Sequence, residues 1–263
     1  MLVYRYELRR YRKYILTWSL SLAFFIFVMT PVYNRMVSSA SSISDRFGKG
    51  GFLTTLGVSL EYLKTPIGMY AFLTSFLMLA GGIFGMHMGL LLFTKECTQG
   101  TAEYLYTKPI TRGHIFRAKV LCLFTGILFM GLIFLLASLA TMTIFQPGYA
   151  MKELLLLALS LPLHALCYGA LGLLFGILWQ KNRSPLLTAS LTVFIGYCIT
   201  AFARTVSVKP LSYLSPFSFF EPVAIHELGR YEYHYFLWYL ILLAGFVFAA
   251  SHFLKKNDIQ LVG

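Results

Sequence analysis

The polar stretch between the second and third apolar segments of this chain reads KECTQGTAEYLYTKPITRGHIFRAK, from Lys95 to Lys119. It contains five Lys and Arg residues and two Glu residues, a composition that does not cross a bilayer. Thr111 can cap a helix that continues directly into the third apolar segment. The stretch is therefore tied closely to an apolar segment at each of its ends, and its motion is coupled to theirs.

The residues inside this stretch predict a short helix lying across one face of the membrane. Gly100 interrupts the preceding apolar segment, and either Thr98 or Thr101 can cap the start of the short helix. Glu103 near the first turn interacts favourably with the helix dipole. Pro109 ends the helix, because the residue before a proline avoids the helical region of backbone space.

The composition places the whole chain in a membrane. Of its 263 residues, 58% are hydrophobic and only 12% are charged, with a mean hydropathy of +0.71. A soluble domain has about half apolar and about a quarter charged residues. The net charge of +12 does not indicate nucleic-acid binding here, because the cations lie at the ends of apolar segments. These apolar segments are expected to contact the lipid bilayer.

Six apolar segments are long enough to span that bilayer. The shortest has 18 residues, which just crosses a hydrocarbon core of about 30 Å at 1.5 Å per residue. The sequence thus predicts an all-α membrane protein with one transmembrane domain over residues 1–263. The predicted spans are Ile15–Val32, Ile67–Phe93, Val120–Phe145, Leu154–Trp179, Leu186–Ala203 and Phe236–Leu254.

The distribution of Lys and Arg predicts the orientation of the six spans. One side of the membrane carries 14 of these residues and the other carries 8. Cytoplasmic loops hold the excess of positive charge. The richer side includes both termini and the segment 95–112, so all three are expected in the cytoplasm.

Two further segments carry their own patterns. Tyr4, Leu8, Tyr11 and Ile15 form one helical face within a basic stretch, which predicts an amphipathic helix over residues 1–14 in the inner interface. That helix either contacts a cytoplasmic partner or anchors the chain to lipid, and both roles are compatible. The segment 204–235 is too apolar for a free loop and too rich in proline for a span, which predicts a re-entrant or interfacial hairpin with its backbone buried in protein.

Small and ionisable residues within the spans complete the candidate set. Gly81, Gly85 and Gly89 form G-x-x-x-G repeats, which allow close helix packing either between subunits or within one subunit. His87 and His164 are ionisable residues at membrane depth, and hydrogen-bonded packing is the simpler role for each. The cysteines form no C-x-x-C pair, so no metal site is expected.

The polar stretch resembles the first cytoplasmic loop of ABC-2 type export permeases. The family pattern runs from an acidic residue through Gly-Thr, a second acidic residue, two leucines, Pro-Val/Ile and Ser-Arg to Gly-Lys. This chain departs from it mildly in Tyr104, Tyr106, Thr111 and Ala118, and its ending FLKKNDIQL also resembles the family's. The matching residues are Glu96, Gly100, Thr101, Glu103, Leu105, Pro109, Ile110, Arg112 and Lys119.

The resemblance implies a transport subunit that is not itself an enzyme. Two separate ABC ATPase subunits would bind ATP and Mg, and the permease would form a dimer with itself or with a sister chain in a bacterial inner membrane. Glu96–Pro109 would be the coupling helix, with Glu96 and Glu103 paired to groups on the ATPase. Gly100 and Pro109 would set its ends. Thr101 and Arg112 complete the predicted coupling residues.

Two other classes of protein fit the sequence less well. An intramembrane enzyme would need a catalytic motif such as G-x-S-x-G or H-E-x-x-H, and neither occurs. A motor-independent secondary transporter usually carries carboxylates at membrane depth, and none lies inside the predicted spans. The sequence also lacks a G-x-x-x-x-G-K-[ST] loop, so a partner chain would supply the ATP site. The cargo is expected to be amphipathic or apolar, such as a peptide, lipid or drug.

Overall fold

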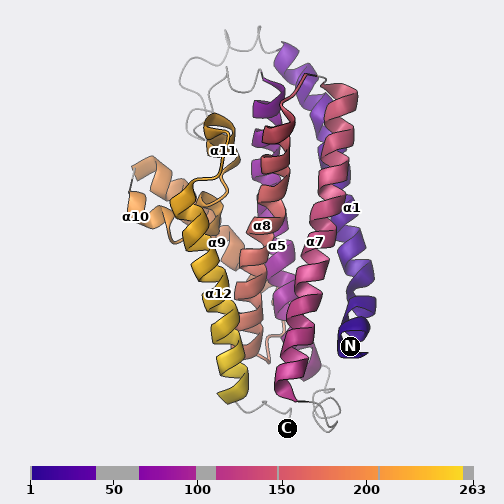
Figure 1. The fold of residues 1–263 in the computed structure, drawn as a ribbon, viewed down its shortest axis with the longest axis vertical. Helices are drawn as coiled ribbons and strands as arrows, with labels where there is room; N and C mark the ends of the chain where they lie inside the picture. The colour runs from indigo at the N-terminus through magenta and orange to yellow at the C-terminus, as the bar shows by residue number, and fades with distance from the viewer. Residues whose placement is uncertain (1, 40–64, 99–110, 147, 207, 257–263) are drawn as a thin grey trace.

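The computed structural model describes residues 2–39, 65–98, 111–146, 148–206 and 208–256. Within these ranges every regular element is a helix, and six of the helices are long (Figure 1). All six are long and apolar enough to cross a membrane, which confirms the predicted all-α fold and span count. The long helices are α1 (Leu2–Ser39), α5 (Pro66–Thr98), α7 (Arg112–Phe145), α8 (Met151–Leu178), α9 (Pro185–Val206) and α12 (Tyr233–Lys256).

The helices form an elongated bundle in which successive long helices run in opposite directions. The start of α1, the end of α5, the start of α7 and the end of α12 all lie at the bottom of Figure 1. We call this the terminal end of the bundle, and the opposite end the far end. Both ends of the predicted coupling segment therefore lie beside the first and last described turns of the chain.

Helices α5 and α8 form the centre of the bundle, and their glycines explain how closely they approach. A Cβ atom placed on Gly85 would lie 2.1 Å from the carbonyl oxygen of Ala165, and one on Gly89 would lie 2.3 Å from that of Gly169. On Gly81 it would meet only the side chain of Leu161, at 2.9 Å. These three glycines thus face α8 of the same chain, which supports packing within one subunit over packing between subunits.

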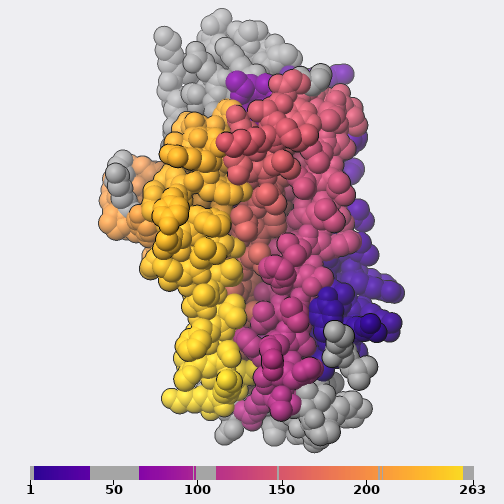
Figure 2. All heavy atoms as spheres, viewed as in Figure 1, coloured from indigo at the N-terminus to yellow at the C-terminus, as the bar shows by residue number. Residues whose placement is uncertain are grey.

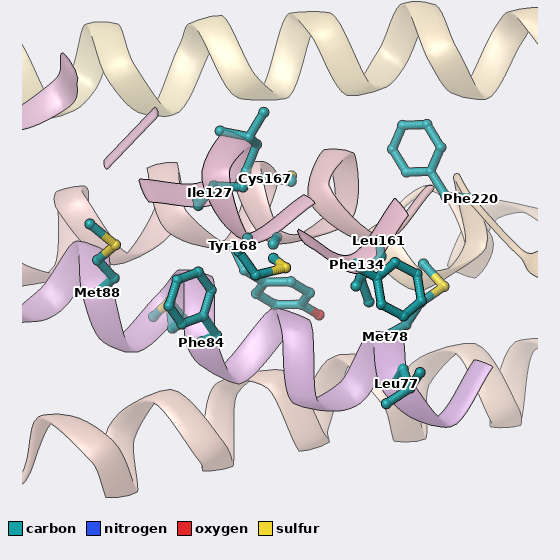
Figure 3. Packing of buried hydrophobic residues seen from close by; sticks show 14 of the residues in the cluster. Leu77, Met78, Phe84, Met88, Ile127, Phe134, Leu161, Cys167, Tyr168 and Phe220 are labelled. Atoms are coloured by element: carbon teal, nitrogen blue, oxygen red, sulfur yellow. The ribbon is translucent and has the colours of Figure 1, made fainter. Parts of the chain in front are cut away.

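Aromatic and aliphatic side chains fill the space around this central pair. Figure 3 shows Phe84 of α5, Tyr168 of α8, Ile127 of α7 and Phe220, from the segment before α12, gathered between the helices. Helix α12 lies on the outside of the bundle, beside α7 and α8 (Figure 2). Few of its side chains are buried, as is also true of α1 and α9, and apolar faces of this kind are suited to lipid or to another subunit.

Helix α1 differs from the separate interfacial helix expected over residues 1–14. It is continuous for 38 residues, or about 57 Å at 1.5 Å per residue, so it extends well beyond a hydrocarbon core of about 30 Å. The predicted apolar face packs against protein: Tyr11 and Ile15 are buried, and the Tyr4 hydroxyl lies 3.1 Å from that of Thr125 in α7. No Gly or Pro breaks the helix before Ile15, so residues 2–14 continue directly into the first span, and an interfacial position for them stays a prediction.

The segment 204–235 folds into three short helices between α9 and α12. These are α10 (Lys209–Ser212), η1 (Pro216–Ser218) and α11 (Pro222–Leu228). Each carries a proline in its first turn, where the missing N–H group costs no helical hydrogen bond. The six-residue spacing of these prolines therefore marks helix starts. Burial of Phe217, Phe219 and Phe220 supplies the protein contacts that a re-entrant segment requires.

Candidate functional site

The terminal end of the bundle holds the residues that bracket the predicted coupling segment. Of the six predicted coupling residues, Glu96 and Arg112 belong to the described helices. Gly100, Thr101, Glu103 and Pro109 lie outside the described residues. Thr98 is the last residue of α5, and its hydroxyl donates to the carbonyl of Thr94 at 3.0 Å; the helix that it was expected to cap lies outside the described residues. Thr111 takes the expected N-cap position of α7, although its side chain makes no capping hydrogen bond.

A buried cluster of three charged residues joins α1, α5 and α7 at this end. The Lys119 ammonium lies 2.6 Å from Oε1 of Glu96 and 3.7 Å from Oε1 of Glu7. It also donates to the carbonyl oxygen of Leu92 and lies 4.8 Å from the centre of the Phe93 ring. Each of the three helices contributes one charged residue, so we refer to Glu7, Glu96 and Lys119 as the ion cluster.

Burial makes the ion cluster electrostatically strong. Lys119 is completely buried, and Glu7 and Glu96 are only 3% and 8% exposed. Charges in such surroundings are poorly screened by water and salt, so two carboxylates and one ammonium interact more strongly than the same groups on a surface. Removing Lys119 would leave both carboxylates without a counter-charge in a site from which water is largely excluded. The cluster therefore holds the three helices at fixed positions relative to one another.

The position of Glu96 corrects one expectation from the sequence. Its carboxylate was expected to pair with a group on a partner ATPase, but it is buried and bound to Lys119 of its own chain. The physical reason is the length of α5, which continues to Thr98 and so carries Glu96 past the predicted end of the span and alongside α7. Glu96 thus joins the last turn of α5 to α7.

Arg112 holds the other end of the coupling segment. Its guanidinium group donates to the backbone carbonyl of Leu254, at 3.5 Å, in the last turn of α12. Carbonyl groups in the last turn of a helix have no partner within the helix and carry its negative dipole end, so an arginine is well suited to bind them. Glu96 and Arg112 thus contact different parts of the bundle: Glu96 binds Lys119 of α7, and Arg112 binds α12.

Hydrogen bonds extend the contact between α1 and α5 away from the ion cluster. The Tyr11 hydroxyl donates to the carbonyl of Leu91 at 3.1 Å, and the Tyr14 hydroxyl lies 3.0 Å from Nδ1 of His87. The ammonium group of Lys95 lies 5.0 Å from the centre of the Tyr11 ring. His87 is therefore a hydrogen-bonded packing residue, as the sequence indicated.

His164 is also hydrogen-bonded, but its partner was not predicted. Its Nδ1 atom lies 3.3 Å from the carbonyl oxygen of Pro216 in η1. The Ser215 hydroxyl donates to the carbonyl of Gly196 in α9 at 2.8 Å. These two bonds fix η1 against α8 and α9.

A groove of about 440 Å³ lies between α5, α9 and the short helices, on the half of the bundle nearer the far end. The lining is largely aromatic and aliphatic, with Ser75, two threonines and Arg204 as polar additions. Arg204 forms an ion pair of 2.6 Å with Glu221, the residue that precedes α11. The lining residues include Phe72, Phe76, Phe194, Tyr197, Phe217 and Val223.

The burial of the Glu221 carboxylate makes the stability of the protein depend on pH. Burial raises the pKa of Glu221 above its ordinary value of 4.5, and the neighbouring Arg204 offsets only part of that shift. Between pH 4.5 and the folded-state pKa, Glu221 binds more protons in the folded protein than in the unfolded protein. The contribution of Glu221 to stability is therefore full below pH 4.5 and is lost as the pH rises through the folded-state pKa.

We expect Glu221→Gln to remove this pH dependence without loss of stability at pH 7. The amide cannot ionise, and Arg204 is 44% exposed, so water can solvate the arginine left behind. The measurement compares unfolding temperatures of wild type and variant from pH 4.5 to 7.5. The wild type should lose more stability over this range than the variant. A variant that is less stable at pH 7 and follows the same pH profile would contradict this account of Glu221.

Sequence reasoning missed two parts of this arrangement. Glu7 was not singled out, although it is a lone acidic residue in a basic stretch and lies on the same helical face as Tyr4 and Tyr11. That placement is the signal that could have identified it. The groove gave no such signal, because its walls come from separate helices. Within the described ranges, no three His, Cys, Asp or Glu side chains come together in a way that could hold a metal ion.

Comparison with known families matches nearly the whole chain to one group. The family described as ABC-2 family transporter protein matches residues 1–259. No curated protein matches the chain significantly.

Proposed function

Since the chain belongs to the ABC-2 transporter family, we propose that it is the transmembrane permease subunit of an ATP-driven exporter. The match over residues 1–259 is the observation that carries this proposal, because it includes all six spans and the coupling segment between α5 and α7. The chain would move cargo and leave ATP hydrolysis to a partner. ATP and Mg would bind to that partner, and this chain would hold no cofactor.

The terminal end is assigned to the cytoplasm in this proposal. The excess of Lys and Arg in the segments predicted for that side of the membrane supports the assignment. Two ATPase subunits would bind there, one to each permease of a dimer formed with a second copy or a sister chain. The segment Glu96–Pro109 would act as the coupling helix, and closure of the ATPases would drive the helices between inward- and outward-facing states. A bacterial inner membrane is the expected location.

The groove between α5 and α9 supports an amphipathic or apolar cargo. Its aromatic walls suit an apolar body, and the Arg204–Glu221 pair offers charge at one edge. The short helices α10, η1 and α11 would form a re-entrant segment at the outer side, bordering the groove through Phe217 and Pro222. Cargo would leave past these residues.

Replacing Glu103 with lysine tests the coupling role directly. In the proposal, Glu103 binds the ATPase, while Glu96 binds Lys119 of its own chain. We expect Glu103→Lys to lower ATP hydrolysis by the purified complex about tenfold or more, since a reversed charge replaces an attraction with a repulsion at the contact. Glu227→Lys, which changes an exposed carboxylate on α11, is the matched control and should leave hydrolysis unchanged. Equal hydrolysis by wild type and Glu103→Lys would exclude Glu103 from the coupling contact.

A further inference from the structure

We propose that Glu7 makes the N-terminal part of α1 a moving member of the coupling unit, through the ion cluster that it forms with Lys119 and Glu96. This inference rests on the proposed function and adds to it a positioning residue outside the coupling segment. Glu7 would not touch the ATPase or the cargo. It would ensure that a displacement of the segment between α5 and α7 also displaces α1.

The position of the ion cluster supports this role. Glu96 lies in the last turn of α5, at the start of the coupling segment, and Lys119 lies near the start of α7, soon after the segment ends. Glu7 approaches from α1, a helix that is distant from both in sequence. The one ammonium group therefore joins the entry and the exit of the segment to a third helix.

The physical properties of the cluster make it suited to transmit motion. A buried ion pair contributes little net stability compared with an apolar contact of the same size, but separating its members is costly, because each would be left as an unpaired charge. Apolar packing can slide with small losses, whereas this cluster cannot open gradually. The three helix ends are therefore expected to move as one body when the ATPase displaces the segment.

Further contacts carry the motion along α1. Tyr11 and Tyr14 bind α5 at Leu91 and His87, as described above. Further along the helix, α1 packs along α7, so the same rigid element reaches from the ion cluster to the far end. A push at the terminal end can thus reach the other end of the bundle through α1 as well as through α5 and α7.

The test uses the complete permease–ATPase complex in lipid nanodiscs and needs no knowledge of the cargo. A cysteine at Thr205, which lines the groove and is exposed, reports on motion at the far half through its rate of labelling by a maleimide. Cys97 and the exposed Cys198 are changed to serine, while the buried Cys122 and Cys167 remain. We call the protein with these three substitutions the parent. In the parent, addition of ATP with vanadate should change the rate at which the cysteine at position 205 is labelled.

Glu7→Gln is the decisive variant, because Lys119 keeps its 2.6 Å partner Glu96 and the fold should persist. We expect the ATPase still to co-purify and to hydrolyse ATP, while the ATP-dependent change in labelling falls about fivefold or more. A purely structural role would lower the unfolding temperature without uncoupling hydrolysis from labelling. Arg9→Gln removes an exposed charge from the same stretch of α1 and should behave as the parent.

The outcomes separate the two proposals. A parent that responds to ATP together with a Glu7→Gln variant that responds equally overturns the role of Glu7 and leaves the exporter proposal standing. A parent with no ATPase partner overturns both. If the yield of Glu7→Gln is too low to assay, Glu7→Ala, which also removes the charge, gives the same decision. A reduced response supports the role, and a full response overturns it.

Discussion

Replacing Gly85 with alanine is expected to remove most of the folded protein from the membrane. The added methyl group would lie 2.1 Å from the carbonyl oxygen of Ala165, and that oxygen belongs to the backbone of α8 and cannot rotate away. The central pair of helices must then separate. Overpacking typically costs about 1–3 kcal/mol, and we expect about 3 kcal/mol or more here because a backbone group is struck.

Two other glycines provide matched controls for this expectation. At Gly81 the new methyl group would meet only the end of the Leu161 side chain, which can change rotamer, so Gly81→Ala should cost clearly less. Gly245 in α12 has open space around its Cα, and Gly245→Ala should be neutral or slightly stabilising. The measurement is the fraction of protein that remains monodisperse in size-exclusion chromatography after heating. If Gly85→Ala were as stable as Gly245→Ala, the close approach of α5 and α8 would be wrong.

The second large effect is expected from Lys119→Met. Methionine fills a similar volume but leaves the buried carboxylates of Glu7 and Glu96 without their ammonium partner. Breaking a buried ion pair by removing one member costs about 3–5 kcal/mol. The variant should therefore unfold at a much lower temperature than wild type, in the same heating assay.

Rescue of this variant distinguishes charge from packing. The triple variant with methionine at positions 7, 96 and 119 contains no unpaired charge, and it should recover most of the lost stability. Lys256→Met, at an exposed position at the end of α12, should have no effect. A Lys119→Met variant as stable as Lys256→Met would show that the ion cluster is not buried in the folded protein.

The sequence predicted the architecture because the membrane imposes strong and local rules. Apolar runs of 18 or more residues specify spans wherever they occur, and the six predicted spans match the six long helices. The prolines at 210, 216 and 222 predicted that no span forms there, and each lies in the first turn of a short helix between α9 and α12, while a re-entrant position stays a prediction.

The candidate site was harder to predict because its contacts join residues that are far apart in the chain. The pattern at Glu96 is compatible with an external partner or an internal one, and only the placement of Lys119 beside it decides between them. The apolar face of Tyr4, Leu8 and Tyr11 is equally suited to lipid and to protein, and periodicity does not distinguish these surroundings. The glycines at 81, 85 and 89 predicted close packing but not the identity of the neighbouring helix.

The most direct test of the exporter account is purification of the tagged chain from its native cells in a mild detergent, with identification of the proteins that accompany it and an assay of ATP hydrolysis. The account expects an ABC ATPase at a one-to-one ratio with the permease and ATP hydrolysis by the purified complex. A chain that is purified alone under several gentle conditions, with no ATP hydrolysis, would contradict it.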